Sequence, residues 1–159
     1  MKNLLITFFV IGTIFSSLQA GEVDSDWLYR EYGAIMETLE NKTASADEVL
    51  AGFIHLLNKN DRKLQADLAL YMMQAFALRP DATIAALSND DIAFRNWLDG
   101  LESLGGTEAC GEGQQTVQRY ASEMTTVLKT FEGAENKMFS AMANDLEEAI
   151  VKLRPHGMR

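Results

Sequence analysis

Few residues of this chain have side chains suited to catalysis. There are two histidines and one cysteine among 159 residues. His55 falls inside an expected helix beside its apolar stripe, where histidine is more often a surface or boundary residue than a base or a ligand. His156 follows Pro155 in an expected tail, which is a poor place for a rigid catalytic group. The sequence therefore singles out no catalytic residue.

The short motifs of several common enzyme classes are missing. The chain has no His-Glu-x-x-His pair for zinc, no Gly-x-Ser-x-Gly elbow and no Gly-x-x-x-x-Gly-Lys phosphate loop. Two of its 23 acidic residues, brought together by the fold, would suffice for glycoside hydrolysis, but no local spacing selects such a pair. We expect these acids to be solvated residues on helix faces.

Cys110 lies in a glycine-rich acidic segment, with Glu108 and Glu112 two residues away on either side. Nearby carboxylates disfavour the thiolate, so a nucleophilic role has little support. A single cysteine cannot close a disulfide within its own chain. We expect either an inert thiol or, in an oxidising compartment, an intermolecular disulfide that joins a homodimer.

Methionine and histidine offer a weak case for a metal or haem site. Met138 and Met142 are four residues apart on one expected helix face, and together with His55 they would offer ligands for copper(I) or haem. Methionine is more commonly an adaptable core filler, and the Cys-x-x-Cys-His attachment motif of haem is absent. We expect no metal and no cofactor.

Composition and charge limit the classes of partner. Apolar residues make up 47% and charged residues 23%, which is ordinary for a globular protein. The formal net charge of −9 repels the phosphates of nucleic acids, so we expect no nucleic-acid partner. The same charge favours a basic protein partner.

The first twenty residues resemble a secretory signal peptide in their pattern. Lys2 is followed by an apolar run from Leu4 to Phe15, and the segment ends in small residues up to Ala20. We predict a signal peptide over 1–20 and one helical domain over 21–159 with a short disordered C-terminal tail. The protein is then exported, periplasmic in a Gram-negative host and otherwise secreted, with no membrane span after cleavage.

Apolar residues recur every three or four positions almost throughout residues 21–159, and we find no convincing alternating, β-branched run. This pattern predicts an all-α fold, a single irregular or orthogonal bundle of about six or seven helices. A capping box starts the second helix at Ser45, and Gly105-Gly106 are expected to stop the fifth. Around Gly133 we favour a helical hairpin over one long bent helix. The expected helices cover about 25–39, 45–57, 61–78, 81–87, 90–104, 117–131 and 138–153.

Two of these apolar stripes include residues whose burial is a specific expectation. Tyr32 is placed on the buried face of the first helix, and Ile92 on that of the fifth. Trp27, Tyr29 and Tyr32 are also candidate anchors for a protein partner, although large aromatics more often pack inside their own domain.

The leading hypothesis is an exported protein-binding module that acts by non-catalytic contacts, as an inhibitor, an immunity-type protector or an envelope accessory factor. Glu108 and Glu112 in the glycine-rich segment are its first candidate contact residues. The alternative is a helical carrier of a small apolar ligand, metal or haem. A third hypothesis is a hydrolase that uses dispersed carboxylates.

Overall fold

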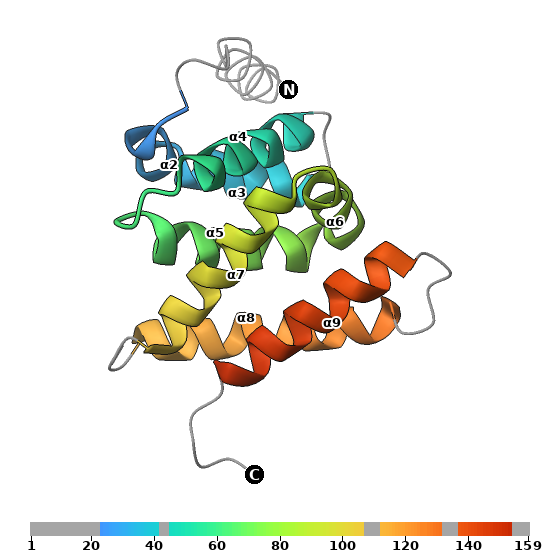
Figure 1. Ribbon diagram of the computed structural model, residues 1–159. Coiled ribbons are helices and arrows are strands. Elements are labelled where there is room, and N and C mark those ends of the chain that lie inside the picture. The colour runs from blue at the N-terminus through green and yellow to red at the C-terminus, as the bar shows by residue number, and fades with distance from the viewer. Residues whose placement is uncertain (1–22, 42–44, 107–111, 132–136, 154–159) are drawn as a thin grey trace, which may run out of the picture.

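The computed structural model describes residues 23–41, 45–106, 112–131 and 137–153 (Figure 1). Within these ranges the chain forms eight α-helices and one short 3-10 helix, η1, with no strand, and the helices form a compact bundle. The all-α prediction is confirmed. The helices are α2 (Ser25–Arg30), α3 (Tyr32–Glu40), α4 (Ser45–Lys59), α5 (Gln65–Leu78), α6 (Pro80–Ser88), α7 (Asp91–Gly106), α8 (Glu112–Leu128), η1 (Lys129–Phe131) and α9 (Lys137–Lys152).

The first expected helix is in fact two helices, which accounts for the higher number. The carboxylate of Asp24 accepts a hydrogen bond from the Trp27 N–H at 2.9 Å and caps α2. Glu31, at φ −101° and ψ 10°, ends α2 and precedes α3. This break takes Tyr32 out of the buried stripe, and its side chain is 38% exposed. The expectation that Tyr32 is buried was wrong.

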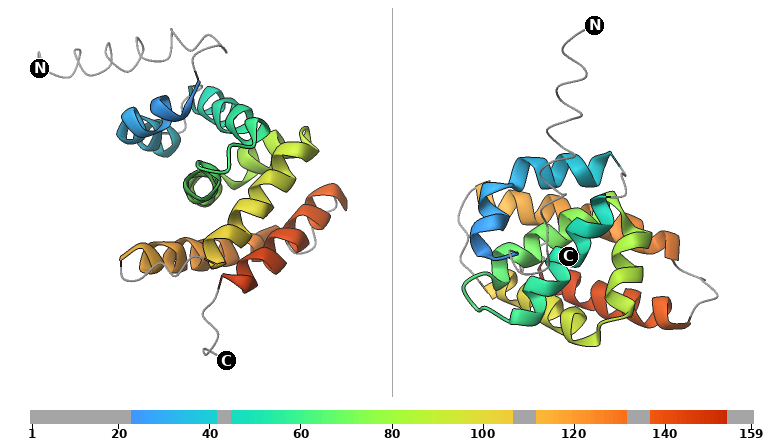
Figure 2. Two further views of the ribbon diagram at one scale, coloured as in Figure 1. Left: turned by 60° about the vertical axis from the view of Figure 1, so that its left-hand side comes forward. Right: turned by 90° about the horizontal axis from the view of Figure 1, so that it is seen from above.

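Helix α5 occupies the centre of the bundle. It packs against α3, α4, α6, α7 and α8, and α7 crosses in front of it (Figures 1 and 2). A helix that is apolar nearly all round is stable only when other helices cover it. Half of α5 is accordingly buried, namely Leu68, Ala69, Met72, Met73, Gln74, Ala75 and Phe76.

Helices α5 and α7 cross in close contact. Of the three described glycines with a built Cβ, Gly100 at this crossing leaves the least space for a side chain. The indole Nε1 of Trp97 donates to the backbone carbonyl of Ala69 at 3.2 Å. One turn further along α7, a Cβ at Gly100 would lie 2.8 Å from the backbone oxygen of Gln65. Glycine at this position therefore sets how closely the two helices approach.

Both ends of α7 test the sequence predictions. The Asp90 carboxylate accepts from the Ala93 N–H at 3.0 Å, as the expected cap requires, and this bond, with one from Asn58, lowers the pKa of Asp90. Ile92 is 65% exposed, so its predicted burial was wrong: the buried stripe passes through Ala93, Trp97 and Leu101. Gly105 and Gly106 are the last two residues of α7, at the end where the sequence predicted the helix to stop.

Residues 112–131 and 137–153 hold two separate helices, α8 and α9, which pack against each other (Figure 2). The hairpin prediction is thus confirmed over one long bent helix, while Gly133 itself lies outside the described residues. Both helices cover the lower side of α5 and α7 in Figure 1. In the parts of the chain that the structure describes, every helix falls short of the length or the apolarity needed to cross a membrane.

Candidate functional site

The candidate contact residues of the glycine-rich acidic segment lie largely outside the described part of the chain. Glu108 and Cys110 fall in the segment 107–111, and His156 falls in 154–159. Glu112 is the first residue of α8, but its side chain is not among those described. A partner contact through Glu108 and Glu112, and a disulfide through Cys110, stay predictions.

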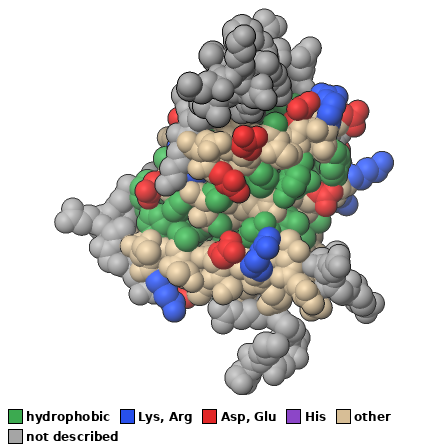
Figure 3. All heavy atoms as spheres, turned by 180° about the vertical axis from the view of Figure 1, so that it is seen from behind, with side chains coloured by type: hydrophobic (Ala, Val, Ile, Leu, Met, Phe, Trp, Pro, Cys, Tyr) green, Lys and Arg blue, Asp and Glu red, His purple; other side chains and the backbone are tan. Residues whose placement is uncertain are grey.

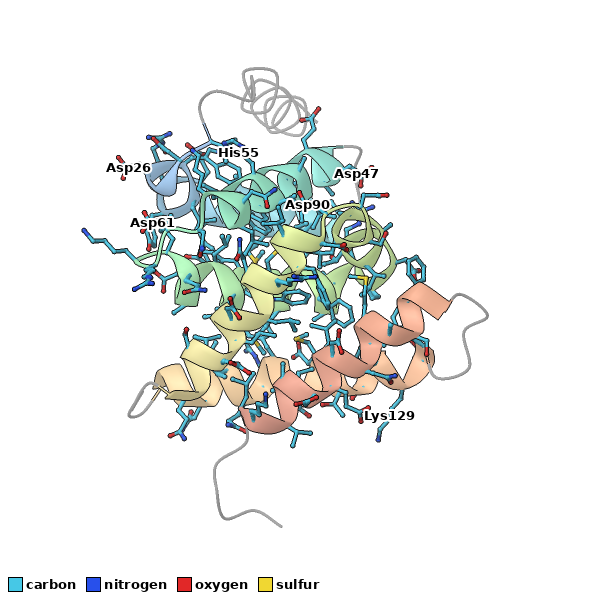
Figure 4. The ribbon with its side chains drawn as sticks, in the orientation of Figure 1. Asp26, Asp47, His55, Asp61, Asp90 and Lys129 are labelled. Carbon is cyan, nitrogen blue, oxygen red and sulfur yellow. The ribbon has the colours of Figure 1, made fainter. Side chains whose placement is uncertain are left out.

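The other candidates for chemistry are dispersed over the described surface. His55 is exposed on α4, and the labelled acids Asp26, Asp47, Asp61 and Asp90 spread across one half of the molecule without converging (Figure 4). Among the described residues, no group of three or more His, Cys, Asp or Glu side chains is placed to hold a metal ion. Met142 is 7% exposed and packs in the core, whereas the side chain of Met138 is not described.

A cluster of tyrosines joins three helices at the surface. Asp67, Tyr71 and Gln74 are spaced by four and three residues, so they share one face of α5. The Tyr29 hydroxyl, from α2, donates to the Asp67 carboxylate. The Tyr32 hydroxyl, from α3, donates to the Gln74 Oε1 at 3.3 Å. We call these five residues the tyrosine face.

The rings of the tyrosine face are supported from the core. The centroids of Tyr32 and Tyr71 are 5.1 Å apart, and Tyr71 is stacked on buried Phe53 at 6.5 Å. Phe53 in turn meets Trp27 edge-on at 6.3 Å. Trp27 is 5% exposed, so it packs inside the domain and is not a surface anchor. A continuous row of aromatic contacts thus holds the rings of Tyr32 and Tyr71 in place, whereas Tyr29 is held by its hydrogen bond to Asp67.

Tyr29 and Tyr32 are accessible to solvent although their hydroxyls are hydrogen-bonded to residues of α5. Tyr29 is 50% exposed and Tyr32 is 38% exposed, while Tyr71 is partly buried. Figure 3 shows apolar side chains gathered in a band across the rear of the molecule, with acidic side chains beside it. Helices α3 and α5 lie toward this rear side, behind α4 and α7 in Figure 1.

The electrostatics of the tyrosine face are dominated by carboxylates. The hydrogen bond to Asp67 is the largest cause that raises the pKa of Tyr29 to about 12, followed by burial and by the charges of Asp67 and Asp61. Burial is the main cause that raises the pKa of Tyr71. Within the described residues, neither Asp67 nor Asp61 is in an ion pair.

We expect Tyr29 to titrate separately from an ordinary tyrosine. Because the folded protein favours the protonated phenol, the Tyr29 contribution to stability is complete below pH 10 and is lost as pH rises toward 12. Tyrosinate absorbance, compared between the wild type and Tyr29→Phe, should show one missing group with a midpoint near 12. Asp67→Asn keeps an acceptor but removes the charge, so it should lower that midpoint. A missing group that titrates near 10 would contradict the Tyr29–Asp67 bond.

Two hollows bear on the carrier hypothesis. Between α8, η1 and α9 lies a cavity of about 40 Å³, lined by residues that include Leu128, Phe131 and Ala143. This volume suits a water molecule, because pockets for drug-sized ligands are about 300–1,000 Å³. The second hollow, lined by polar residues that include Arg62, Asp99 and Glu102, is wide open to solvent. The carrier and hydrolase hypotheses stay predictions.

Sequence reasoning found part of the tyrosine face. Tyr29 and Tyr32 were named as candidate anchors, but Asp67, Tyr71 and Gln74 were not connected with them. The spacing of Asp67, Tyr71 and Gln74 could have indicated this cluster. It places two polar side chains and a tyrosine on one face of a mainly apolar helix.

No protein-family model, curated protein or solved structure matches this chain. The case for a function therefore rests on the described geometry and on the sequence.

Proposed function

We infer that the chain is an exported protein-binding module that acts through contacts and not through bond chemistry, as an inhibitor, an immunity-type protector or an envelope accessory factor. The tyrosine face is the observation that supports this proposal best. Half-exposed tyrosines with few rotatable bonds contribute much of the energy at protein interfaces. Here both rings are hydrogen-bonded to residues of α5, and Tyr32 also packs on Tyr71, which is stacked on Phe53, so little conformational entropy is lost on binding.

The charge of the chain and its N-terminal sequence support the remaining parts of the proposal. A net charge of −9 favours a basic partner surface. The signal-like residues 1–20 support export, to the periplasm in a Gram-negative host or otherwise to the exterior. In addition to the tyrosine face, Glu108 and Glu112 are proposed as contact residues, and Cys110 is proposed as the link in a homodimer.

A quantitative capture experiment tests the protein-binding proposal. The wild type, a Tyr29→Ala/Tyr32→Ala variant and a Tyr120→Ala variant would be immobilised and incubated with native envelope extract from the host. Tyr120 is the matched control, because it lies on α8 under the Arg119 guanidinium, 4.6 Å from the ring centroid, and outside the tyrosine face. Retained proteins would be quantified by mass spectrometry, and thermal unfolding would verify that each variant is folded.

We expect one protein in near-stoichiometric amount on the wild type and on Tyr120→Ala, reduced more than tenfold on the double variant, because two lost hot-spot rings cost about 2 kcal/mol or more in binding free energy. Equal capture by all three would remove the tyrosine face from the proposal. Specific retention of a metal, haem or lipid without any protein would overturn the proposal in favour of the carrier.

A further inference from the structure

The tyrosine face combines exposed aromatic surface with two carboxylates that form no ion pair among the described residues. These carboxylates, of Asp67 and the nearby Asp61, are exposed. Asp67 raises the pKa of Tyr29 by its hydrogen bond and its charge, and Asp61 raises it by its charge, while the Tyr29 residue is 50% exposed. Such a surface attracts a cation to the ring faces and to the carboxylates at the same time.

Arg62 and Lys63 follow Asp61 directly in the sequence, but among the described residues no basic side chain forms an ion pair with Asp61 or Asp67. Arg30, the closest in sequence to Tyr29, has its guanidinium Nε 3.2 Å from Glu31. The Asp67 carboxylate instead accepts from the Tyr29 hydroxyl, which is neutral, and the nearby Asp61 accepts from the backbone N–H of Lys63 at 2.9 Å. Each carboxylate thus accepts a hydrogen bond from an uncharged donor and not from a basic side chain.

Arginine fits this combination better than lysine. Its flat guanidinium stacks on an aromatic ring while its N–H groups form two parallel hydrogen bonds to a carboxylate, whereas lysine carries a compact and more strongly hydrated charge. Within the described residues, the Arg119 guanidinium on α8 already lies over an aromatic ring, 4.6 Å from the Tyr120 ring centroid.

From this geometry we propose that the tyrosine face binds an arginine-containing basic segment of a protein partner, with a guanidinium placed over the Tyr29 ring and paired with Asp67. This proposal rests on the protein-binding function above and adds the chemistry of the partner. Asp61 contributes attraction at longer range, which dissolved salt screens. Tyr32 and Tyr71 provide the adjoining apolar contact for the rest of the segment.

A pair of peptides tests the partner chemistry directly. The probe is a short capped peptide with two arginines separated by glycine, and its control replaces both arginines with citrulline, which has a similar shape but no charge. Binding to the full-length chain, produced with its own leader, would be followed by NMR of ring-labelled tyrosine. The rings of Tyr29, Tyr32 and Tyr71 should shift with the arginine peptide, and that peptide should bind at least tenfold more tightly than the citrulline peptide.

Charge variants separate this proposal from the general binding function. Asp61→Asn/Asp67→Asn keeps the hydrogen-bond acceptors and should weaken binding of the arginine peptide about tenfold at low salt, since exposed charge pairs each contribute modestly. Asp47→Asn is the control, because Asp47 is an exposed carboxylate on α4 that pairs with Arg79, between α5 and α6, and is not part of the tyrosine face. Equal affinity for the arginine and citrulline peptides, or shifts confined to other residues, would overturn the proposal.

The protein retained in the capture experiment allows a second test, in which its retention by the tyrosine variants is compared with its retention by the aspartate variants. If its retention depends on Tyr29 and Tyr32 but is unchanged by Asp61→Asn/Asp67→Asn and by salt, the basic-segment proposal is wrong while the binding function stands. If a protein is retained but its retention does not depend on the two tyrosines, the tyrosine face is not the contact surface and the basic-segment proposal fails, while a binding function through another surface stands.

Discussion

Trp97→Ala is expected to lower the free energy of unfolding by about 3–5 kcal/mol, as is typical for removal of a fully buried tryptophan. The Trp97 side chain has no exposed surface and is the largest of the fully buried side chains in the described residues. Its ring lies 6.1 Å from Phe76 and 6.5 Å from Phe94. Alanine would leave a cavity at the α5–α7 crossing and would remove the indole donor from the Ala69 carbonyl.

Urea unfolding followed by far-ultraviolet circular dichroism measures this loss without relying on tryptophan fluorescence. Trp97→Phe keeps part of the ring volume but not the hydrogen bond, so its loss should be smaller, about 1–3 kcal/mol. Ile92→Ala is the control on the same helix, because Ile92 is 65% exposed and its change should stay within about 0.5 kcal/mol. Similar unfolding midpoints for Trp97→Ala and Ile92→Ala would contradict the packing of α7 on α5.

Gly100→Ala should have the second largest effect, a loss of about 1–3 kcal/mol in the free energy of unfolding. The added Cβ would lie 2.8 Å from the Gln65 backbone oxygen and 2.9 Å from the Ala69 Cβ. Neither neighbour is the end of a flexible side chain. The methyl group therefore fits only if α5 and α7 move apart, which loosens the contacts around Trp97 as well.

Gly33→Ala is the matched control for Gly100→Ala, because it is expected to raise the free energy of unfolding and not to lower it. Gly33 lies in α3, and a Cβ built there meets nothing within 4 Å. Alanine should stabilise the protein by about 0.5–1 kcal/mol, because it restricts the unfolded chain and favours the helix. Both variants would be compared by the same urea unfolding. A gain of stability in Gly100→Ala would show that the helices are not in close contact there.

The sequence was sufficient to predict the helices themselves. Apolar spacing placed the helical segments, although it merged α2 and α3 into one, because an amphipathic helix must turn one face to the core whatever its neighbours are. Local chemistry also predicted several ends correctly: Asp90 caps α7, and Pro80 begins α6, where its missing N–H costs nothing. The break at Glu31 was missed, since the apolar spacing continues across it and no glycine or proline marks it.

Only the tertiary structure decided which surface residues meet. Tyr29 and Asp67 are 38 residues apart in the chain, and Tyr32 and Gln74 are 42 apart. Their partners depend on how α2 and α3 lie across α5, and that arrangement follows from the packing of Trp27, Phe53 and Tyr71 beneath them. Helical periodicity indicates which face of a helix is buried, because the apolar residues that form this face lie within the helix's own sequence. It carries no information about which helix covers that face, so the sequence by itself determined the helices and the tertiary packing determined the tyrosine face.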